Sequence, residues 1–201
     1  GYTQLSTGNL FRKHIAKQTD LGCQIDFAIK SGKLVKDDIV SKVVENWLIC
    51  TPGLSSSVIF DGFPRTLVQA QTLHDFLNIK YTDVKVLIVK FDIPDSVVIQ
   101  RLSNRVVCKN KECQAVYSLL ESSGLRPKND QECDKCGHEI IVRADDQPEA
   151  IRKRLLIYHK HEDDMLDFYS RNGYEVIHLD MTQPTQGSFR DFVNKSDLQL
   201  A

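Results

Sequence analysis

Apolar and polar positions repeat along this chain with two periods, one typical of helices and one of strands. Short β-branched apolar runs predict three buried strands, at 58–60, 84–91 and 176–179. Helical spacing predicts helices over about 69–77, 95–102 and 149–172, the last stopped by Gly173 in a left-handed conformation. Because strands alternate with helices, the pattern predicts an α/β fold with a parallel sheet.

The amino-terminal part of the chain is predicted to be helical. Ser6 or Thr7 is a suitable cap for a helix that reaches about Thr19. A second helix is expected to close near Ser31-Gly32. A third helix follows Asp37-Asp38 and brings four apolar residues to one face, namely Ile39, Val43, Val44 and Trp47.

The segment 104–143 interrupts this pattern with polar residues, turn formers and four cysteines, and it shows no helical period. The cysteines form two close pairs separated by nineteen residues, Cys108/Cys113 and Cys133/Cys136. Two such pairs can wrap four thiolates around one tetrahedral zinc ion, and a closed shell of this kind is structural. The alternative is a lobe with four free cysteines that folds without metal. Cys23 and Cys50 lie in predicted helices and are expected to be small buried residues.

Composition limits the classes of protein that fit. The 201 residues, 41% hydrophobic and 26% charged, predict one globular domain with a small insertion. No run of about 18 or more apolar residues occurs, so a membrane partner is not expected. A four-cysteine ribbon could also belong to a nucleic-acid-binding protein, but the net charge is −1 and the lobe has a single aromatic residue, Tyr117. We expect no nucleic-acid partner and a cytoplasmic monomer, because reduced cysteines favour that compartment.

The run Asp61-Gly62-Phe63-Pro64-Arg65-Thr66 follows a predicted strand directly and opens into a helical pattern. In an open α/β sheet, ligands bind in the crevice beyond the carboxyl ends of the strands. The planar guanidinium of Arg65 suits a phosphate group at such a place. An ordinary strand-to-helix turn is the alternative interpretation of these six residues.

This run resembles the AMP-site signature of adenylate kinases, and further motifs follow in the family's order over almost the whole chain. They are Ser6-Thr7-Gly8-Asn9-Leu10-Phe11-Arg12, Gly32-Lys33-Leu34-Val35, Asp145-Asp146-Gln147 and Arg152-Lys153-Arg154. The resemblance implies an α/β nucleoside monophosphate kinase fold with a parallel sheet and a small zinc-ribbon-like lid. It implies a core over 1–103 with an AMP-binding segment at about 6–35, a lid over 104–143, and more core over 144–201.

The activity implied by the resemblance is reversible transfer from ATP to AMP, which yields two ADP. Family members begin with a strand, a Gly-rich phosphate loop and a helix, yet no G-x-x-x-x-G-K-[ST] occurs in these 201 residues. The resemblance therefore implies that the first strand and the phosphate loop are missing, and that this chain is impaired. Two alternatives stay open: a truncated, noncatalytic nucleotide-binding protein, and a kinase for another nucleoside monophosphate.

The resemblance also assigns the site residues. For AMP they are Thr7, Arg12, Lys33, Leu34, Val35, Gly62, Phe63, Pro64, Arg65, Gln69, Arg143 and Arg154. For ATP they are Arg101, Arg105, Val116, Tyr117 and Gln183. The arginines expected at the transferring group are Arg65, Arg101, Arg143 and Arg154. Magnesium is expected with ATP, held through water by Asp61.

Three positions depart from the family's pattern. Asn104 stands where the family often has glycine, Val106 stands where it has a second arginine, and four residues rather than two separate Cys108 from Cys113. Thr7 is what adenylate kinases carry, whereas kinases for pyrimidine monophosphates tend to have alanine there. The resemblance therefore favours adenylate over other acceptors.

Overall fold

The computed structural model describes residues 2–30, 35–51, 57–81, 83–183 and 185–196. The fold is mixed α/β with parallel strands. Its contacts divide the chain into two compact units. The first unit contains Gly1–Val86 with His161–Phe168, and the second contains Leu87–Lys160 with Tyr169–Ala201.

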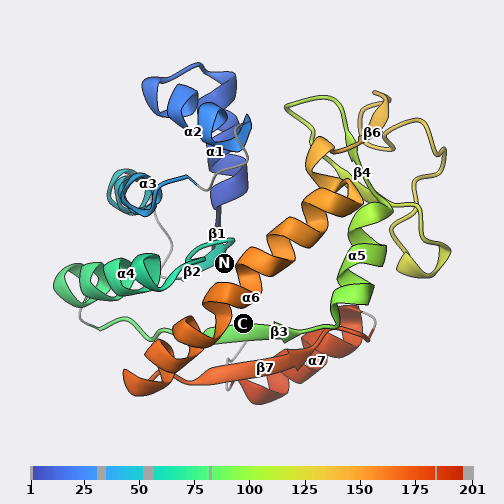
Figure 1. Cartoon of the computed structure of the whole chain (residues 1–201). Coiled ribbons are helices and arrows are strands. Elements are labelled where there is room, and N and C mark those ends of the chain that lie inside the picture. Colours follow the sequence, from blue (N-terminus) through green and yellow to red (C-terminus); the bar gives the residue numbers. More distant parts are fainter. Residues whose placement is uncertain (1, 31–34, 52–56, 82, 184, 197–201) are drawn as a thin grey trace. The chain divides into compact units, whose positions relative to one another are not determined.

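The described residues of the first unit form a two-stranded parallel sheet, helices α1 to α4 and a segment of α6 (Pro148–Arg171) (Figure 1). Strand β1 (Thr3–Ser6) pairs with β2 (Val58–Asp61) so that Thr3 faces Val58 and Ser6 faces Asp61. The helices are α1 (Thr7–Ala16), α2 (Asp20–Lys30), α3 (Asp37–Cys50) and α4 (Leu67–Lys80). Because β1 and β2 are parallel and in register, Ser6-Thr7 and Asp61-Gly62 leave the sheet at the same edge.

One apolar cluster joins the sheet of this unit to its helices. Leu5 of β1, Val44 of α3 and Phe63 after β2 are nearly inaccessible, and Val40 and Leu48 complete the cluster. The helical spacing of α3 places its apolar residues on this side. Phe63 is therefore an anchor that fixes where the chain turns after β2.

Helices α1 and α2 meet at very close range. A Cβ added to Gly22 would lie 2.1 Å from the carbonyl oxygen of His14, so only glycine fits. The Thr19 hydroxyl accepts a hydrogen bond from the Gly22 amide at 3.0 Å and lies 3.0 Å from Nδ1 of His14. The turn between the two helices is thus held by side chains as well as by packing.

The second unit contains a second two-stranded parallel sheet. Strand β3 (Ile88–Asp92) pairs with β7 (Val176–Asp180), with Ile88 opposite Val176 and Asp92 opposite Asp180. Its helices are α5 (Asp95–Ser103), α6 (Pro148–Arg171) and α7 (Thr185–Lys195), and residues 161–168 of α6 group with the first unit. Ser188 donates to the Asp180 carbonyl at 2.8 Å, which ties α7 to the end of β7.

The same unit contains an antiparallel sheet of three strands within 104–143 (Figure 1). Its order is β5-β4-β6, formed by Val116–Ser118, Arg105–Cys108 and Ile140–Val142. Short 3₁₀ helices occur at Glu121–Ser123 and Ala144–Asp146. A separate small core fills the lobe, made by Val106, Cys108, Ala115, Tyr117, Cys133 and Ile140.

Most predicted helices and strands are confirmed, with shifted ends. The first helix stops at Ala16 rather than near Thr19, because Gln18 has φ +49° and the Thr19 amide bonds back to the His14 carbonyl. The predicted strand 84–91 starts only at Ile88, since β7 supplies pairing partners from that residue onward. Ser6 is the N-cap of α1 by position, but its side chain makes no capping bond.

Several features differ from the sequence prediction. Cys23 and Cys50 are exposed rather than buried, because they lie on the outer faces of α2 and α3. Strand β1, helix α7 and the three strands of the lobe were not predicted. In the described parts of the chain, no helix combines the length and the apolar character needed to cross a bilayer.

Candidate functional site

The turn after β2 brings together three predicted AMP residues. The Thr7 hydroxyl donates to the carbonyl oxygen of Gly62 at 2.8 Å, and Nε of Arg65 donates to the same oxygen at 2.8 Å. Gly62 has φ +75°, and a Cβ there would lie 2.8 Å from Nη2 of Arg65 and 3.1 Å from Oγ1 of Thr7. The left-handed backbone therefore favours glycine, and any larger residue would also displace the Arg65 guanidinium.

The rest of the motif holds this turn in place. Phe63 is buried in the apolar cluster, and the Phe63–Pro64 peptide bond is cis. Thr66 caps α4 by accepting from the Gln69 amide at 3.3 Å. Arg65, by contrast, is exposed. Buried anchors on both sides thus present one exposed guanidinium at the carboxyl end of a strand.

Arg12 is a second exposed guanidinium in this unit. It lies on α1, and its Nη2 donates to Oδ1 of Asn9 one turn earlier. Nη1 of Arg12 would be 3.4 Å from a Cβ at Gly8, so the side chain folds back toward the first turn of the helix. Backbone amides at a helix start favour anions, and a guanidinium beside them adds to that preference.

Gln69 and Val35 are the other described residues predicted for AMP in this unit. Gln69 is 5% exposed, and both ends of its side-chain amide make hydrogen bonds. Val35 is partly buried and packs against the apolar cluster. Lys33 and Leu34 lie outside the described residues.

In the second unit, a buried carboxylate holds two of the predicted arginines. Asp146 is 1% exposed and accepts two bonds from Arg105, from Nε at 2.8 Å and from Nη2 at 2.7 Å. Nη2 of Arg154 donates to Oδ1 of the same carboxylate at 3.2 Å, while its Nη1 reaches Asp145 at 3.3 Å. Strand β4 and helix α6 therefore each contribute an arginine that bonds to the same carboxylate.

Two arginine side chains that bond to Asp146 are partly exposed to solvent. The side chains of Arg105 and Arg154 are 24% and 39% exposed, whereas that of Asp146 is 0% exposed. Arg143 lies at the start of the 3₁₀ turn that carries Asp146 and is half-buried, and Arg101 is exposed in the last turn of α5. Of these four arginines, Arg105 and Arg154 bond to the buried carboxylate of Asp146.

The residues predicted to contact the ATP base differ in exposure. Val116 is 48% exposed, but the Tyr117 side chain is buried in the core of the lobe. Its hydroxyl lies 3.4 Å from Sγ of Cys133. Gln183 is exposed after β7 and donates to Oδ2 of Asp180 at 3.4 Å. The aromatic ring of Tyr117 is therefore part of the core of the lobe and does not lie on an open surface.

The four cysteines of the lobe converge on one point. Their sulfur atoms all lie within 4.8 Å of one another, with Cys108 and Cys136 at 3.4 Å and Cys113 and Cys133 at 3.7 Å. A zinc ion about 2.3 Å from four tetrahedral sulfurs would set them about 3.8 Å apart. All six cysteines of the chain are free thiols. The donor set therefore fits zinc, despite the longer spacing between the first pair.

Tight turns give the cysteines this geometry. The amides of Cys136 and Gly137 both bond to the Cys133 carbonyl, at 3.3 and 2.8 Å, and Gly137 has φ +69°. In the first pair, the Cys113 amide bonds to the Asn110 carbonyl at 3.1 Å. The two additional residues of this pair are thus absorbed in a turn that still returns Cys113 to the site.

Neighbouring groups shift the acidity of the thiols in opposite directions. The hydrogen bond from the Tyr117 hydroxyl lowers the pKa of Cys133 to about 6. Burial raises the pKa of Cys108 to about 12, and the hydrogen bond to Cys133 raises that of Tyr117 to about 12. A thiolate at Cys133 is thus favoured by its surroundings, and thiolates are the form that binds zinc.

Asp61, the residue predicted to hold magnesium, ends β2 and is exposed. Its Oδ2 accepts from Nε2 of Gln4 at 3.2 Å. Asp61 directly precedes Gly62, at the end of the sheet where Thr7 and Arg65 bond to the Gly62 carbonyl. An exposed carboxylate at this place suits a hydrated cation.

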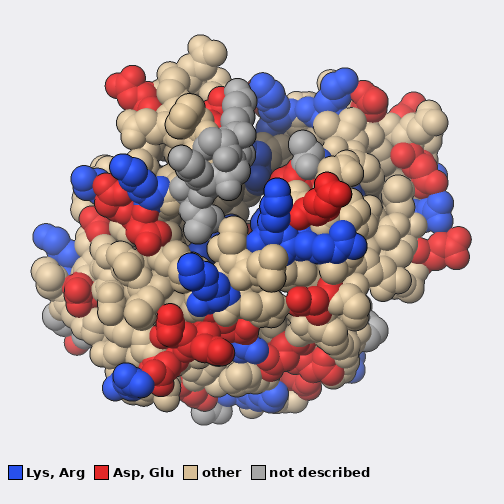
Figure 2. All heavy atoms as spheres, in the orientation of Figure 1, with Lys and Arg blue, Asp and Glu red and all other residues tan. Residues whose placement is uncertain are grey.

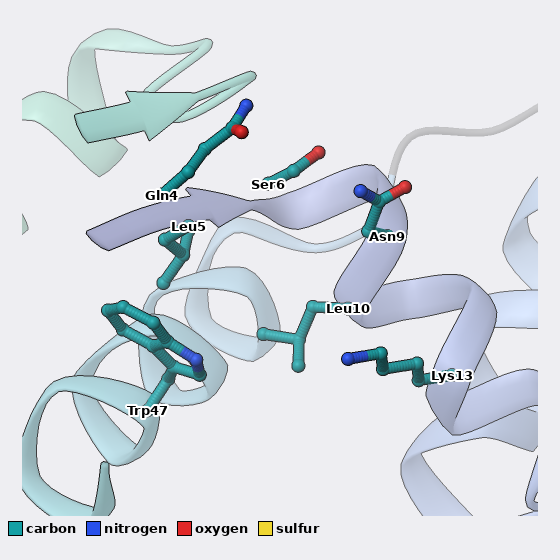
Figure 3. A pocket seen from close by; sticks show the side chains of 7 residues that line it. All are labelled: Gln4, Leu5, Ser6, Asn9, Leu10, Lys13 and Trp47. Carbon is teal, nitrogen blue, oxygen red and sulfur yellow. The ribbon is translucent and has the colours of Figure 1, made fainter. Parts of the chain in front are cut away.

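A cavity of about 140 Å³ opens in the first unit among β1, α1 and α3 (Figure 3). It is lined by Gln4, Leu5, Ser6, Asn9, Leu10, Lys13 and Trp47. Figure 3 shows Leu5 directed toward the ring of Trp47, whereas Gln4 and Ser6 point to the other side of the strand. None of the predicted site residues that the structure describes lines this cavity. Figure 2 shows acidic and basic side chains intermixed over the face in view.

Sequence reasoning missed two partners of the site residues. Asp37 bonds to Gln69 from 32 residues away, and Tyr117 bonds to Cys133 across 16 residues. Neither contact has a local sequence signal, because each joins separate elements. In the motif Asp145-Asp146-Gln147, Asp146 bonds to Arg105 and Arg154, and Asp145 bonds to Arg154.

Comparison with known proteins gives long matches. The family model for adenylate kinase matches residues 1–174. The adenylate kinase of Archaeoglobus fulgidus is 34% identical over 192 residues, which cover 95% of this chain and 84% of that protein. The adenylate kinase of Kosmotoga olearia is 36% identical over 199 residues, with 96% and 88% covered, and that of Thermosipho melanesiensis is 32% identical over 194 residues.

Proposed function

The chain belongs to the adenylate kinase family and is a nucleoside monophosphate kinase, and we propose that its reaction is ATP + AMP = 2 ADP. The observation that carries this proposal is the turn after β2, where one carbonyl oxygen of Gly62 holds both Thr7 and Arg65. An exposed guanidinium fixed at a strand end, with a hydroxyl beside it, suits a phosphate monoester.

In the proposed acceptor site, Arg12 and Arg65 bind the AMP phosphate. Both guanidinium groups are exposed, and each is oriented by a neighbouring oxygen atom, from Asn9 or from Gly62. Gln69 reads the base, and Thr7, Gly62, Phe63 and Pro64 shape the pocket together with Lys33, Leu34 and Val35. A monophosphate carries about two negative charges near neutral pH, which two arginines balance.

The proposed transfer is a direct in-line displacement without a protein nucleophile. Such transfers depend on positioning and on cations around the developing charge. We assign that role to Arg65, Arg101, Arg143 and Arg154, of which Arg65, Arg143 and Arg154 also bind AMP, while Arg101 and Arg105 bind ATP. Asp146 orients two of these arginines, because it accepts bonds from both Arg105 and Arg154. Val116, Tyr117 and Gln183 contact the ATP base, Tyr117 through its backbone because its ring is buried.

Two metal ions accompany this proposal. Cys108, Cys113, Cys133 and Cys136 would hold structural zinc, which replaces the large core that a small lobe lacks. Magnesium supplies charge neutralisation at the ATP phosphates, and Asp61 would hold it through water. Four reduced thiols in one lobe support a cytoplasmic setting.

We assign residues 1–103 and 144–201 to the core and 104–143 to a lid. The small core of the lobe supports this division, because its members all lie within 104–143. A lid that closes over the phosphates would exclude water and so favour transfer over hydrolysis. The 201 residues contain no G-x-x-x-x-G-K-[ST] loop, and we propose that rapid transfer requires such a loop.

The test measures ADP formed from ATP, AMP and magnesium. It compares the 201-residue chain with the same chain preceded by the strand, phosphate loop and helix of an adenylate kinase. Activity is expected in the longer protein, and Arg65→Ala should lower it by roughly a hundredfold. Arg126→Ala is the matched control, because Arg126 pairs with Asp130 on the exposed surface of the lobe.

Two results would contradict the proposal. If the longer protein forms no ADP but binds AMP, a noncatalytic nucleotide-binding protein is the better reading. If GMP, CMP or UMP replaces AMP with higher kcat/KM, the chain is a kinase for another acceptor. Full activity of the 201 residues alone would refute the requirement for the loop.

A further inference from the structure

The side-chain amide of Gln69 makes two hydrogen bonds, one to a donor and one to an acceptor. Its Oε1 accepts from the backbone amide of Arg65 at 2.8 Å. Its Nε2 donates to Oδ1 of Asp37 at 2.7 Å. The two partners belong to different elements, since Asp37 opens α3 and Arg65 precedes α4.

These partners leave the amide only one favourable orientation. A backbone N–H can only donate, and an ionised carboxylate can only accept. Rotating the amide by half a turn would place Oε1 against the carboxylate of Asp37 and the NH₂ group against the N–H of Arg65. Both contacts would be repulsive, because two donors would face each other at one end of the amide and two acceptors at the other.

The fixed amide keeps one N–H and one oxygen lone pair for a ligand. Adenine presents an amino N–H beside the acceptor N1, which match the free lone pair and the free N–H. Guanine presents the reverse order, an acceptor O6 beside the donor N1–H. In the same pose, guanine would therefore face like groups at both positions.

We propose that Asp37 is a positioning residue that sets the Gln69 amide for a 6-aminopurine and against a 6-oxopurine. The inference rests on the proposed function, in which Gln69 reads the base of the acceptor nucleotide. Asp37 acts through Gln69 and not on the phosphate. Its effect therefore lies in base discrimination rather than in the transfer step.

The decisive variant is Asp37→Asn, which keeps the shape of the side chain but offers either an oxygen or an NH₂ group. The amide of Gln69 is then free to adopt both orientations. Asp38→Asn is the matched control, because it removes the same charge from the same first turn of α3 at an exposed position. Asp37→Glu restores an acceptor-only group and should recover part of the discrimination.

The measurement is the dissociation constant for AMP and for GMP, obtained by titration calorimetry on the whole chain. We expect Asp37→Asn to lower the preference for AMP over GMP by about tenfold, the equivalent of one net hydrogen bond. Asp38→Asn should leave the ratio unchanged. Where transfer is measured, KM for AMP should rise while kcat at saturating AMP stays the same.

Distinct results separate the inference from the function on which it rests. If the unaltered chain binds AMP no better than GMP, the proposed reading of the base fails and the inference fails with it. If it prefers AMP and Asp37→Asn keeps the same ratio, the role of Asp37 is refuted while the function stands. An equal loss of the preference for AMP in Asp38→Asn would also refute the role of Asp37. If Asp37→Asn does not fold, Asp37→Glu is measured instead, and a failure of that variant to prefer AMP over GMP would refute the role.

Discussion

The carboxylate of Asp146 accepts two hydrogen bonds from the guanidinium of Arg105, 2.7 and 2.8 Å long. The side chain of Asp146 is entirely buried, whereas that of Arg105 is 24% exposed. Arg154 bonds to the same acid. The start of the lobe and the long helix α6 are therefore joined through one charged residue.

Asp146→Asn should destabilise this part of the protein by about 3 kcal/mol, because two partly exposed arginines lose their bonds to a fully buried carboxylate. Asp145→Asn is the control, since the side chain of Asp145 is 58% exposed and makes a single longer pair with Arg154. That change should cost less than about 1 kcal/mol. Denaturant unfolding at neutral pH measures both values. Equal costs for the two variants would contradict the central role of Asp146.

The cysteine cluster should bind one zinc ion per chain in reduced protein. Removing the metal with a chelator should lower the melting temperature, because the lobe has only a small core of its own. Cys133→Ser should abolish binding, whereas the double variant Cys23→Ser/Cys50→Ser should retain it, since both of those thiols are exposed. Metal analysis and a chelator titration give the stoichiometry. Zinc bound equally by Cys133→Ser would disprove the site.

Gly62→Ala should weaken AMP binding as well as the fold. The left-handed backbone costs about 1–2 kcal/mol for a residue with a Cβ. The added atom would also displace Arg65, whose Nη2 would be 2.8 Å away. The loss of a charge-assisted bond, about 1.5–3 kcal/mol, should lower the affinity for AMP by about tenfold or more.

Gly124→Ala is the control for that change. Gly124 has φ +65°, and no atom lies within 4 Å of a Cβ placed there. This variant carries the backbone cost alone and should bind AMP as tightly as the unaltered chain. Thermal unfolding and AMP titration of both variants separate conformational strain from displacement of Arg65. Equal AMP affinities in the two variants would show that Arg65 tolerates the change.

Tyr169 should limit stability at alkaline pH. Burial, and then the neighbouring Tyr174, raises the pKa of its phenol above the usual value of 10.0. A raised pKa stabilises the folded state fully below about pH 10, and this contribution is lost as pH rises toward the folded pKa. The free energy of unfolding should therefore fall by about 1 kcal/mol between pH 9 and pH 11 on account of this group.

Tyr169→Phe should reduce that decline, whereas Tyr2→Phe, at an exposed position, should leave it unchanged. Denaturant unfolding at pH 9 and pH 11 gives the two slopes. The pKa of Tyr117 is also raised, to about 12, so Tyr117 contributes to the decline in both of these variants. An identical slope with and without the hydroxyl of Tyr169 would contradict the prediction.

Helices with a clear apolar period were the features best predicted from sequence. Helix α3 begins at Asp37 as its acidic start indicates, and Gly173 takes the left-handed conformation expected after α6, with φ +75°. Helix α7 was missed although Phe189, Phe192 and Val193 follow the helical period. Its remaining residues are polar, and only packing on β7 compensates for that.

Strands were harder to predict, because a strand exists only where another strand supplies partners. Leu5 is the one large apolar residue of β1, yet pairing with Val58–Asp61 makes Thr3–Ser6 a strand. Conversely, the apolar run from Val84 begins well before β3, and Val84 itself is 50% exposed. Hydrophobicity marks candidate strands, and the neighbouring chain sets their bounds.

The sequence by itself determined the residue types of the site and their order. A strand followed by Asp61 to Thr66 and two close pairs of cysteines are local patterns with a direct chemical meaning. Tertiary structure decided which groups meet, such as Gln69 with Asp37, Arg105 with Asp146, and Tyr117 with Cys133. Hydrogen bonds act over about 3 Å, so partners 16 to 41 residues apart are chosen by the packing of whole elements.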